Sequence, residues 1–537
     1  MQNFNAPHST AAHNFAQVPK ADIPRSSFDR SSGRKTTFDA GYLTPVFVDE
    51  VLPGDTFNLD MTAFVRLATP IHPFMDNMYL DSFFFFVPYR LVWDNWQKFN
   101  GEQRNPGDST SYVVPQIVST AVTGYDNGSI FDYMGLPTKV PGLSHSALPL
   151  RAYNLIYNEW FRDQNLQNSV ANNVGDGPDA VSDYSLLRRG KRHDYFTSAL
   201  PWPQKGPSVA LPLAGNAPVT GIGKDTKVFD PGPFSVWETN GTSAVNYPYA
   251  RNINVAAPDG TFKILGSAAT NATPQIFANL SAVTAATINQ LRQSFQIQKL
   301  YERDARGGTR YTEIIRAHFG VTSPDARLQR PEYLGGGSTP LNITPVAQQS
   351  STILGSPQGN LAAFGTAVMK RHGFTKSFTE HGIVLGMVMA RADLTYQQGL
   401  NRMWSRSTRW DFYWPALAMI GEQAILNKEI YAQGSADPTS DAAVFGYQER
   451  FAEYRYKPSE ITGKMRSNDA ETLDSWHLAQ KFTSLPALNS TFIVENPPVS
   501  RVIAIPSEPQ FLYDGFFKLN CARPMPMYGV PGLIDHF

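Results

Sequence analysis

The stretch DSFFFFVPYR, residues 81–90, places four phenylalanines in succession. Successive side chains of a β-strand point to opposite faces, so a strand with this sequence needs apolar cover on both of its faces. If it lay at an open sheet edge, such a strand would tend to pair with other chains and aggregate. We therefore expect residues 79–87 to form a strand that lies deep in a layered core, or one that a partner subunit covers on one side.

Alternation of apolar residues predicts the other strands. In TFNLDMTAFVRL, residues 56–67, every second residue from Phe57 is apolar, which is the pattern of a half-buried strand. Apolar runs predict further strands at 383–391, 490–494, 501–505 and 511–519. The clearest strand signals thus lie in the first hundred residues and in the last 160, while the middle of the chain is predicted to hold helices and long loops.

Two helices and an insertion are predicted in this middle region. Spacings of three and four place Leu150, Tyr153, Tyr157 and Trp160 on one face of a helix over 149–165. A second helix is predicted over 287–305, after a region, 206–290, that holds only eight charged residues in 85. We interpret 206–290 as a loop-rich insertion with weak strands of its own, which its scattered apolar residues favour over the alternative of a flexible linker.

The composition restricts the class of protein. The 537 residues include 46 Lys and Arg and 46 Asp and Glu, so the net charge is zero, which argues against a protein that coats nucleic acid through bulk charge. Aromatic residues make up 12% and charged residues only 17%, which suggests that partners cover much of the surface. The single cysteine, Cys521, excludes an intramolecular disulfide framework. The first ten residues lack a signal-peptide pattern, and the apolar run 383–390 is too short to span a membrane.

No strong catalytic motif is present. Gly335, Gly336 and Gly337 are followed by Ser-Thr-Pro rather than by a phosphate-binding helix, so we expect a flexible turn there. The histidines lack metal-ligand spacing, and we expect no catalytic residue, cofactor or metal site. Glu449 and Glu453 are spaced like paired acids, which leaves open a carbohydrate-binding or glycoside-cleaving β-sandwich. The arginines between and beside them favour an ion-paired surface instead.

Three segments are candidates for nucleic-acid contact. Residues 401–414 interleave arginines with aromatic side chains, as single-strand binding requires, although core or interface aromatics are the interpretation that we favour. RRGKRH at 188–193 is a short basic run that is either a phosphate contact or a solvated loop, and residues 1–40 are predicted to be a disordered or extended basic arm. The candidate contact residues are Lys20, Arg25, Arg30, Arg34 and Lys35 in the arm, with Arg402, Arg406, Arg409, Trp404 and Trp410 in the aromatic segment.

Several long runs resemble one known family. FVPYRLVWDNWQKFNGE (86–102), LPLRAYNLIYNEWFRDQNL (148–166), FTEHGIVLGMVMARADLTYQQGL (378–400), GYQERFAEYRYKPSEITGKMRS (446–467) and RPMPMYGVPGLIDHF (523–537) are similar to the major capsid proteins of the Microviridae, small single-stranded DNA phages. The gokushovirus branch is the most similar. The resemblance covers most of the chain outside 206–290.

The resemblance implies a mainly β fold, an eight-stranded antiparallel jelly roll of the viral capsid type with long loop and helix insertions. Its first part would be 41–205, with a helical insertion, and its second part 291–537. It implies a structural protein of the virion, not an enzyme, which assembles in the host cytoplasm into a T=1 icosahedral shell around circular single-stranded DNA. The implied partners are other copies of the chain, internal scaffolding, small DNA-binding and pilot proteins, and a bacterial surface receptor that the projecting 206–290 insertion would meet. No membrane insertion is implied.

A third class remains open beside the shell protein and the carbohydrate-active β-sandwich. A soluble protein that binds single-stranded DNA would be a monomer or small oligomer, and its affinity would depend steeply on salt. Its binding would be abolished by Arg406→Ala with Arg409→Ala.

Overall fold

The computed structural model describes residues 24–207, 209, 219–220, 277–278, 288–320, 329–354 and 357–528. The chain divides into two compact units, of which one is Gln204–Gly308 and the other is the remainder. In the first unit, β8 (Val219–Thr220) pairs with β9 (Phe277–Ala278), and α4 (Ile288–Gly307) confirms the predicted helix over 287–305. The predicted insertion falls within this unit, but most of it, including residues 262–265, where one of its weak strands is expected, lies outside the described residues.

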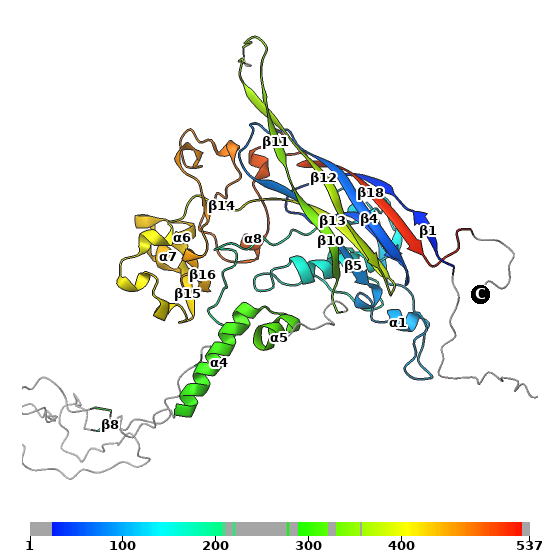
Figure 1. Ribbon diagram of the computed structural model, residues 1–537, viewed down its shortest axis with the longest axis horizontal. Helices are drawn as coiled ribbons and strands as arrows, with labels where there is room; N and C mark the ends of the chain where they lie inside the picture. The colour runs from blue at the N-terminus through cyan, green and yellow to red at the C-terminus, as the bar shows by residue number, and fades with distance from the viewer. Residues whose placement is uncertain are drawn as a thin grey trace, which may run out of the picture. The chain divides into compact units, whose positions relative to one another are not determined.

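Eight strands of the larger unit form two antiparallel sheets (Figure 1). One sheet has the order β2–β18–β4–β12 and the other has the order β3–β13–β5–β10. Counted along the chain, the first strand pairs with the eighth, the second with the seventh, the third with the sixth and the fourth with the fifth, which is the pairing of a jelly roll. The predicted fold class is confirmed. The strands are β2 (Ser32–Phe38), β3 (Thr44–Val51), β4 (Thr56–Leu67), β5 (Met78–Pro88), β10 (Glu332–Pro340), β12 (Leu361–Ser377), β13 (Gly382–Ala392) and β18 (Phe511–Arg523).

Two short strands, β1 (Ser26–Asp29) and β11 (Asn342–Ala347), extend the first sheet to six strands. We call it the six-stranded sheet and the other the four-stranded sheet. Shorter elements fill the connections: α1 (Trp96–Phe99), β6 (Gln116–Val118), α2 (Ile130–Met134), β7 (Ser144–Ser146), α5 (Tyr311–Phe319), β14 (Thr395–Tyr396), β15 (Glu422–Leu426), α6 (Asn427–Ile430), α7 (Pro438–Ala442), β16 (Val444–Glu449) and β17 (Ser459–Glu460).

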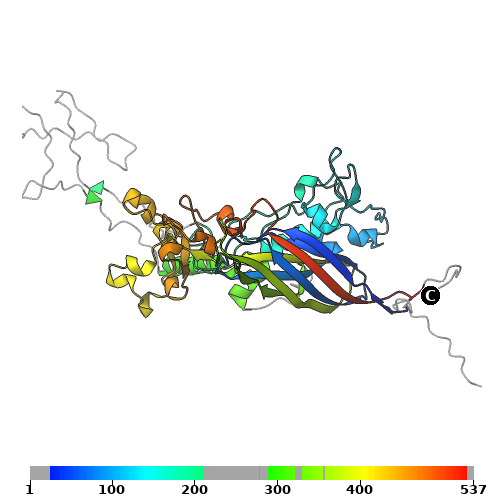
Figure 2. The same ribbon diagram turned by 90° about the horizontal axis from the view of Figure 1, so that it is seen from above.

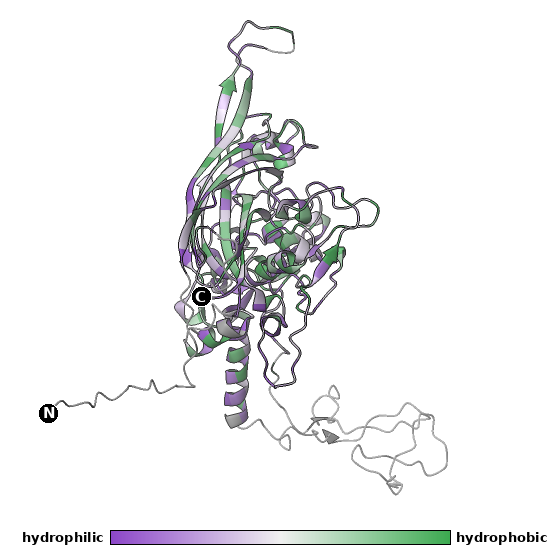
Figure 3. Ribbon diagram, turned by 90° about the vertical axis from the view of Figure 1, so that its right-hand side faces the viewer, coloured by the Kyte–Doolittle hydropathy of each residue, from purple (hydrophilic) through white to green (hydrophobic). Residues whose placement is uncertain are grey.

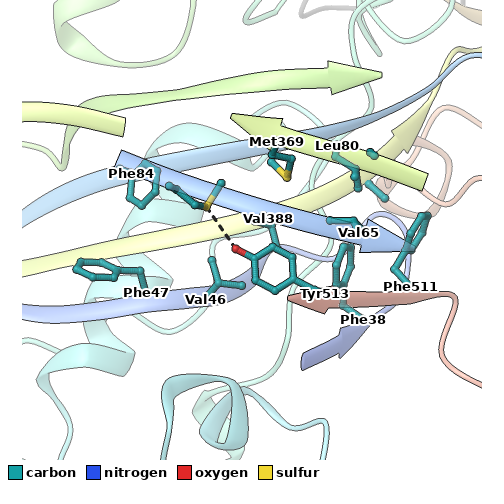
Figure 4. Close-up of a cluster of buried hydrophobic side chains, with 14 of the residues drawn as sticks. Phe38, Val46, Phe47, Val65, Leu80, Phe84, Met369, Val388, Phe511 and Tyr513 are labelled. Atoms are coloured by element: carbon teal, nitrogen blue, oxygen red, sulfur yellow. Dashed lines mark hydrogen bonds between the residues drawn. The ribbon is translucent and has the colours of Figure 1, made fainter. Parts of the chain in front are cut away.

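The main core lies between the two sheets, where buried apolar side chains from both sheets meet (Figure 4). Strand β4 shows the strict alternation that its sequence predicts, with Phe57 to Leu67 buried at every other position. Phe84 and Phe86 of β5 point into this core, and the ring of Phe84 meets that of Phe47 edge to face at 6.4 Å between centroids. The hydroxyl of Tyr513 lies 3.3 Å from the sulfur of Met61.

A second core covers the opposite face of the four-stranded sheet. It receives Phe83 and Phe85 of β5, and α3 (Leu148–Ile156) packs over them, together with the π-helical turn Tyr157–Phe161 that continues it. The ring of Phe161 lies 5.1 Å from that of Phe83 and 5.8 Å from that of Phe85. The four phenylalanines are therefore covered on both faces within one chain, by the facing sheet and by the segment inserted between β5 and β10. This also confirms the predicted helix over 149–165, although it ends earlier.

Two predicted strands are wrong. Residues 490–494 begin with a short helix, α8 (Ser490–Ile493), because the side chain of Asn489 accepts hydrogen bonds from the backbone amides of Thr491 and Phe492. Residues 501–505 form no strand. Arg501 is the last residue of the 3₁₀ turn Val499–Arg501, and 502–505 follow it. The prolines that flank this run cannot donate to a strand ladder, which favours a turn over a sheet strand.

The predicted glycine turn and part of the predicted arm are also strands. Gly336 lies inside β10 with φ of +151°, and a Cβ there would lie 2.0 Å from the carbonyl oxygen of Ser82, so the triplet allows two backbones to approach closely. Residues 26–38, expected to be a disordered or extended arm, pair with β18 at the edge of the six-stranded sheet. Residues 1–23 lie outside the described residues.

Candidate nucleic-acid interface

Residues 401–414 run through two short 3₁₀ turns, Arg402–Ser405 and Arg409–Asp411, between the strands β14 and β15. Their aromatic side chains are largely exposed, at 71% for Trp404 and 58% for Trp410. We call these side chains, with a neighbouring tyrosine, the aromatic patch. Its members are Trp404, Trp410, Phe412, Tyr413, Trp414 and Tyr454.

Two of the arginines beside the patch are already paired within the chain. Arg402 donates to the carboxylate of buried Glu429 at 2.9 Å and to the backbone oxygen of Ala424 at 2.7 Å. Burial raises the pKa of Glu429, and the nearby Arg402 charge opposes that rise. Arg406 donates to Glu453 at 3.2 Å, and its guanidinium lies over the ring of Tyr454 at 4.3 Å. Their charges are thus largely compensated before any ligand binds.

Arg409 differs from these two arginines. Its guanidinium stacks on the rings of Trp414 and Trp410, at 4.6 and 5.4 Å. It forms no ion pair with any residue that the structure describes. Of the three predicted arginines, Arg409 therefore retains the most charge for a phosphate, beside exposed rings.

The described cations of the predicted arm all have partners. Arg30 forms a two-pronged ion pair with Asp49 at 2.5 and 2.8 Å, and Lys35 pairs with Asp514 at 2.7 Å on an exposed surface. Arg34 donates to the backbone oxygen of Tyr133 at 2.6 Å, and Arg25 to the hydroxyl of Thr56 at 2.5 Å. Lys20 lies outside the described residues. These contacts reach both sheets and the helix α2, and of the two ion-paired cations Lys35 is more exposed than Arg30.

Three cations of the basic run 188–193 contact other groups of the chain, while Arg192 and His193 are exposed. Arg188 stacks on the ring of Tyr42 at 4.1 Å, and the buried Lys191 lies over the ring of Phe492 at 4.4 Å. Arg189 lies 3.8 Å from the buried carboxylate of Asp81. Arg192 also lies 3.9 Å from Asp81, although 55% of its side chain is exposed. The charges of the run are therefore largely compensated within the chain.

The buried carboxyl of Glu495, near Lys191, makes stability depend on pH. Burial raises its pKa to about 7, although Lys191, Arg189 and Arg391 oppose the rise. Because the folded chain then binds this proton more tightly than the unfolded chain, the contribution of Glu495 is most favourable below pH 4.5 and is lost as the pH rises to about 7. Replacing Glu495 by Gln should remove this loss. The free energy of unfolding of Glu495→Gln, relative to the original protein, should increase by on the order of 3 kcal/mol between pH 4.5 and about pH 8. A difference that stays constant with pH contradicts this assignment.

The possible paired acids do not face each other across a cleft. Glu449 forms an ion pair with Arg455, and Glu453 accepts from Arg406 and from the side chain of Gln423. A cavity of about 220 Å³ includes Glu453 in its wall but not Glu449.

Within the described ranges, no group of three or more His, Cys, Asp or Glu side chains is arranged to hold a metal ion. No helix in the described part of the chain has the length and apolar character needed to cross a membrane.

The structure gathers a further group of side chains on the outer face of the six-stranded sheet. Phe64 of β4 is 49% exposed and Phe516 of β18 is 52% exposed, and Arg66 and Lys518 project from the same face. This group was not predicted from the sequence. The signal was available, because the alternation in 56–67 and 511–519 assigns these phenylalanines to the solvent-facing positions.

Comparisons with known proteins agree on one family. The family model described as "Capsid protein (F protein)" matches residues 16–533. The chain is 53% identical to "Capsid protein VP1" of Bdellovibrio phage phiMH2K and 47% identical to "Capsid protein VP1" of Chlamydia phage 1, and each comparison covers 98% of both chains. It is 37% identical to "Capsid protein VP1" of Spiroplasma virus 4, over 97% of both chains.

Proposed function

Because the chain belongs to the phage capsid protein (F protein) family, whose members are structural proteins and not enzymes, we propose that its copies assemble into a small T=1 icosahedral shell around circular single-stranded DNA. The observation that carries this proposal is the match over nearly the whole length of relatives named as capsid proteins. The jelly roll supports it, since viral shells are a frequent use of this fold.

The aromatic patch supports assembly through contact between copies of the chain. Exposed tryptophans and tyrosines beside arginines are typical of the buried centres of protein interfaces. The charges of Arg402 and Arg406 are compensated internally, which lowers the cost of burying them against another subunit. We therefore favour subunit contact for the patch and these two arginines. DNA contact by Arg409, Trp404 and Trp410, predicted from the sequence, is the alternative that the tryptophan variant distinguishes.

The shell would assemble in the host cytoplasm with internal scaffolding, small DNA-binding and pilot proteins of the phage. The 206–290 insertion would project from it and bind a bacterial surface receptor. That the insertion falls in a compact unit of its own supports a role separate from the shell. A carbohydrate-active β-sandwich is not favoured, because Glu449 and Glu453 are each paired with an arginine.

The double variant Trp404→Ser, Trp410→Ser should remain a folded subunit and lose closed particles. The reason is that it removes two large exposed rings from the proposed subunit contact. Circular dichroism checks folding, and electron microscopy counts particles after expression with the phage partner proteins. The control is a variant with 206–290 shortened to a brief linker, which should form particles at the normal yield and lose attachment to host cells. Normal particles that lack DNA in the tryptophan variant would instead assign the patch to DNA contact.

A further inference from the structure

The two sheets of the jelly roll differ in what covers their outer faces. Residues 89–187, which follow β5, pack on the four-stranded sheet and bury its outer side chains. On the six-stranded sheet, the outward residues of β4 and β18 are exposed at every second position. Figure 3 shows the sheets on one side of the molecule, with most of the helices of the larger unit on the other. No described segment buries this second face, which leaves room for a ligand.

Apolar side chains form the centre of this exposed face. Val368 of β12 pairs directly with Phe64 of β4, and Phe516 of β18 pairs with Thr62, two residues before Phe64. Partners of this kind lie about 5 Å apart when opposite and about 7–8 Å apart on the diagonal, so the rings are neighbours on one surface. Phe364 of β12 and Leu512 of β18 extend the row, at 39% and 51% exposure. A single exposed ring would need no explanation, but a row across three strands does.

Cations surround this apolar row. Arg66 follows Phe64 on the same face, and Lys370 and Arg371 are both exposed at a bulge in β12 between Met369 and His372. The backbone of Arg371 has φ of +58°, as the bulge requires. Arg66, Lys370 and Arg371 form no ion pair with any other described residue. The five cations of this face, Lys35, Arg66, Lys370, Arg371 and Lys518, outnumber its three carboxylates, Asp29, Asp60 and Asp514.

We propose that this face of the six-stranded sheet binds the single-stranded DNA genome, with bases stacked on Phe64 and Phe516 and phosphates near Arg66, Lys370 and Arg371. The proposal rests on the function proposed above, since it places the genome against this surface inside the shell. Rings that interleave with unpaired cations on a flat sheet are what sequence-independent single-strand binding requires. Duplex DNA, whose bases are already stacked, would use the cations and leave the rings exposed.

Charge favours DNA over a second copy of the chain as the occupant. Two copies of the same face brought together would place like charges opposite each other, because cations are in excess on both. A polyanion compensates that excess, and the neutral Thr and Asn residues between the charges do not repel it. The occupant that the surface fits best is therefore a flexible, negatively charged strand with accessible bases.

Two sets of variants test the proposal, with binding of a labelled oligothymidylate to the unassembled full-length chain as the first measurement. Phe64→Ser with Phe516→Ser should weaken binding by at least about tenfold, because each stacked ring contributes a substantial share of the affinity. Arg66→Gln with Lys370→Gln should reduce the slope of log affinity against log salt by about 1.4, or about 0.7 for each lost phosphate contact. The control is Lys139→Gln with Lys464→Gln, which removes two exposed cations elsewhere and should change neither quantity.

The second measurement, particle formation and DNA content, separates this proposal from the proposed function. Closed particles with less nuclease-protected DNA in both sets of variants, and normal DNA in the control, support the proposal. Unchanged oligothymidylate binding together with normally filled particles overturns it and leaves the shell function intact. Normal binding with no particles also overturns it and assigns the face to contact between subunits. If neither the original protein nor the control forms particles, the proposed shell function itself is contradicted.

Discussion

Replacing Phe84 by alanine should lower the free energy of unfolding by about 3–5 kcal/mol. The ring is fully buried between the sheets, at 0% exposure, and it lies opposite Gly335 on one neighbouring strand and Gly386 on the other. A Cβ on Gly386 would lie only 2.6 Å from this ring, so the ring fills space that the glycine provides. Truncation leaves a cavity that the surrounding strands cannot close. Chemical denaturation of the unassembled subunit measures the loss.

The matched control for this prediction is Phe64→Ala. It removes the same side chain from the adjoining sheet, but at a position where the ring is 49% exposed. Loss of an exposed ring leaves no cavity, so the expected cost is below about 1 kcal/mol. Equal losses for the two variants would contradict the assignment of Phe84 to a close-packed core between the sheets.

Replacing Arg151 by methionine should cost about 3–5 kcal/mol of stability, as expected when a buried ion pair loses one partner. The side chains of Arg151 in α3 and of Asp179 are 1% and 3% exposed, and they are joined by two hydrogen bonds of 2.6 and 2.8 Å. Burial alone would raise the pKa of Asp179, but hydrogen bonds from Arg151 and Tyr184 outweigh it and lower the pKa. Without Arg151, this carboxylate loses two of its hydrogen bonds and keeps the one from Tyr184, and the backbone oxygen of Gly175 loses its donor.

Lys35→Met provides the control for the arginine variant. It breaks the Lys35–Asp514 pair, whose side chains are 78% and 55% exposed, and exposed pairs contribute at most about 1 kcal/mol. The difference between the two variants in chemical denaturation therefore reports burial rather than charge. A small loss for Arg151→Met, equal to that of Lys35→Met, would show that the Arg151–Asp179 pair is accessible to water.

Strands whose two faces differ were predictable from the sequence. Residues 56–67 and 511–519 alternate because one side faces the core and the other faces solvent, and both strands formed where expected. The phenylalanine run was also predictable, since it requires cover on two sides. Residues 490–494 and 501–505 were not, because their apolar composition suits a strand while local hydrogen bonding at Asn489 and the neighbouring prolines decide otherwise.

The candidate site was less predictable than the fold. The pairing of Arg402 with Glu429 and of Arg406 with Glu453 joins residues 27 and 47 positions apart, and no local pattern reveals such partners. The outer face of the six-stranded sheet shows the opposite case. Its residues come from three strands that are distant in the chain, so Phe64 and Phe516 become neighbours only through the sheet register.

Electron microscopy of the protein expressed with its phage partner proteins, combined with a nuclease-protection assay, tests the central claim most directly. The account predicts uniform closed icosahedral particles that contain single-stranded DNA protected from nuclease. Only monomers or small oligomers under the same conditions, with no protected DNA, would contradict it.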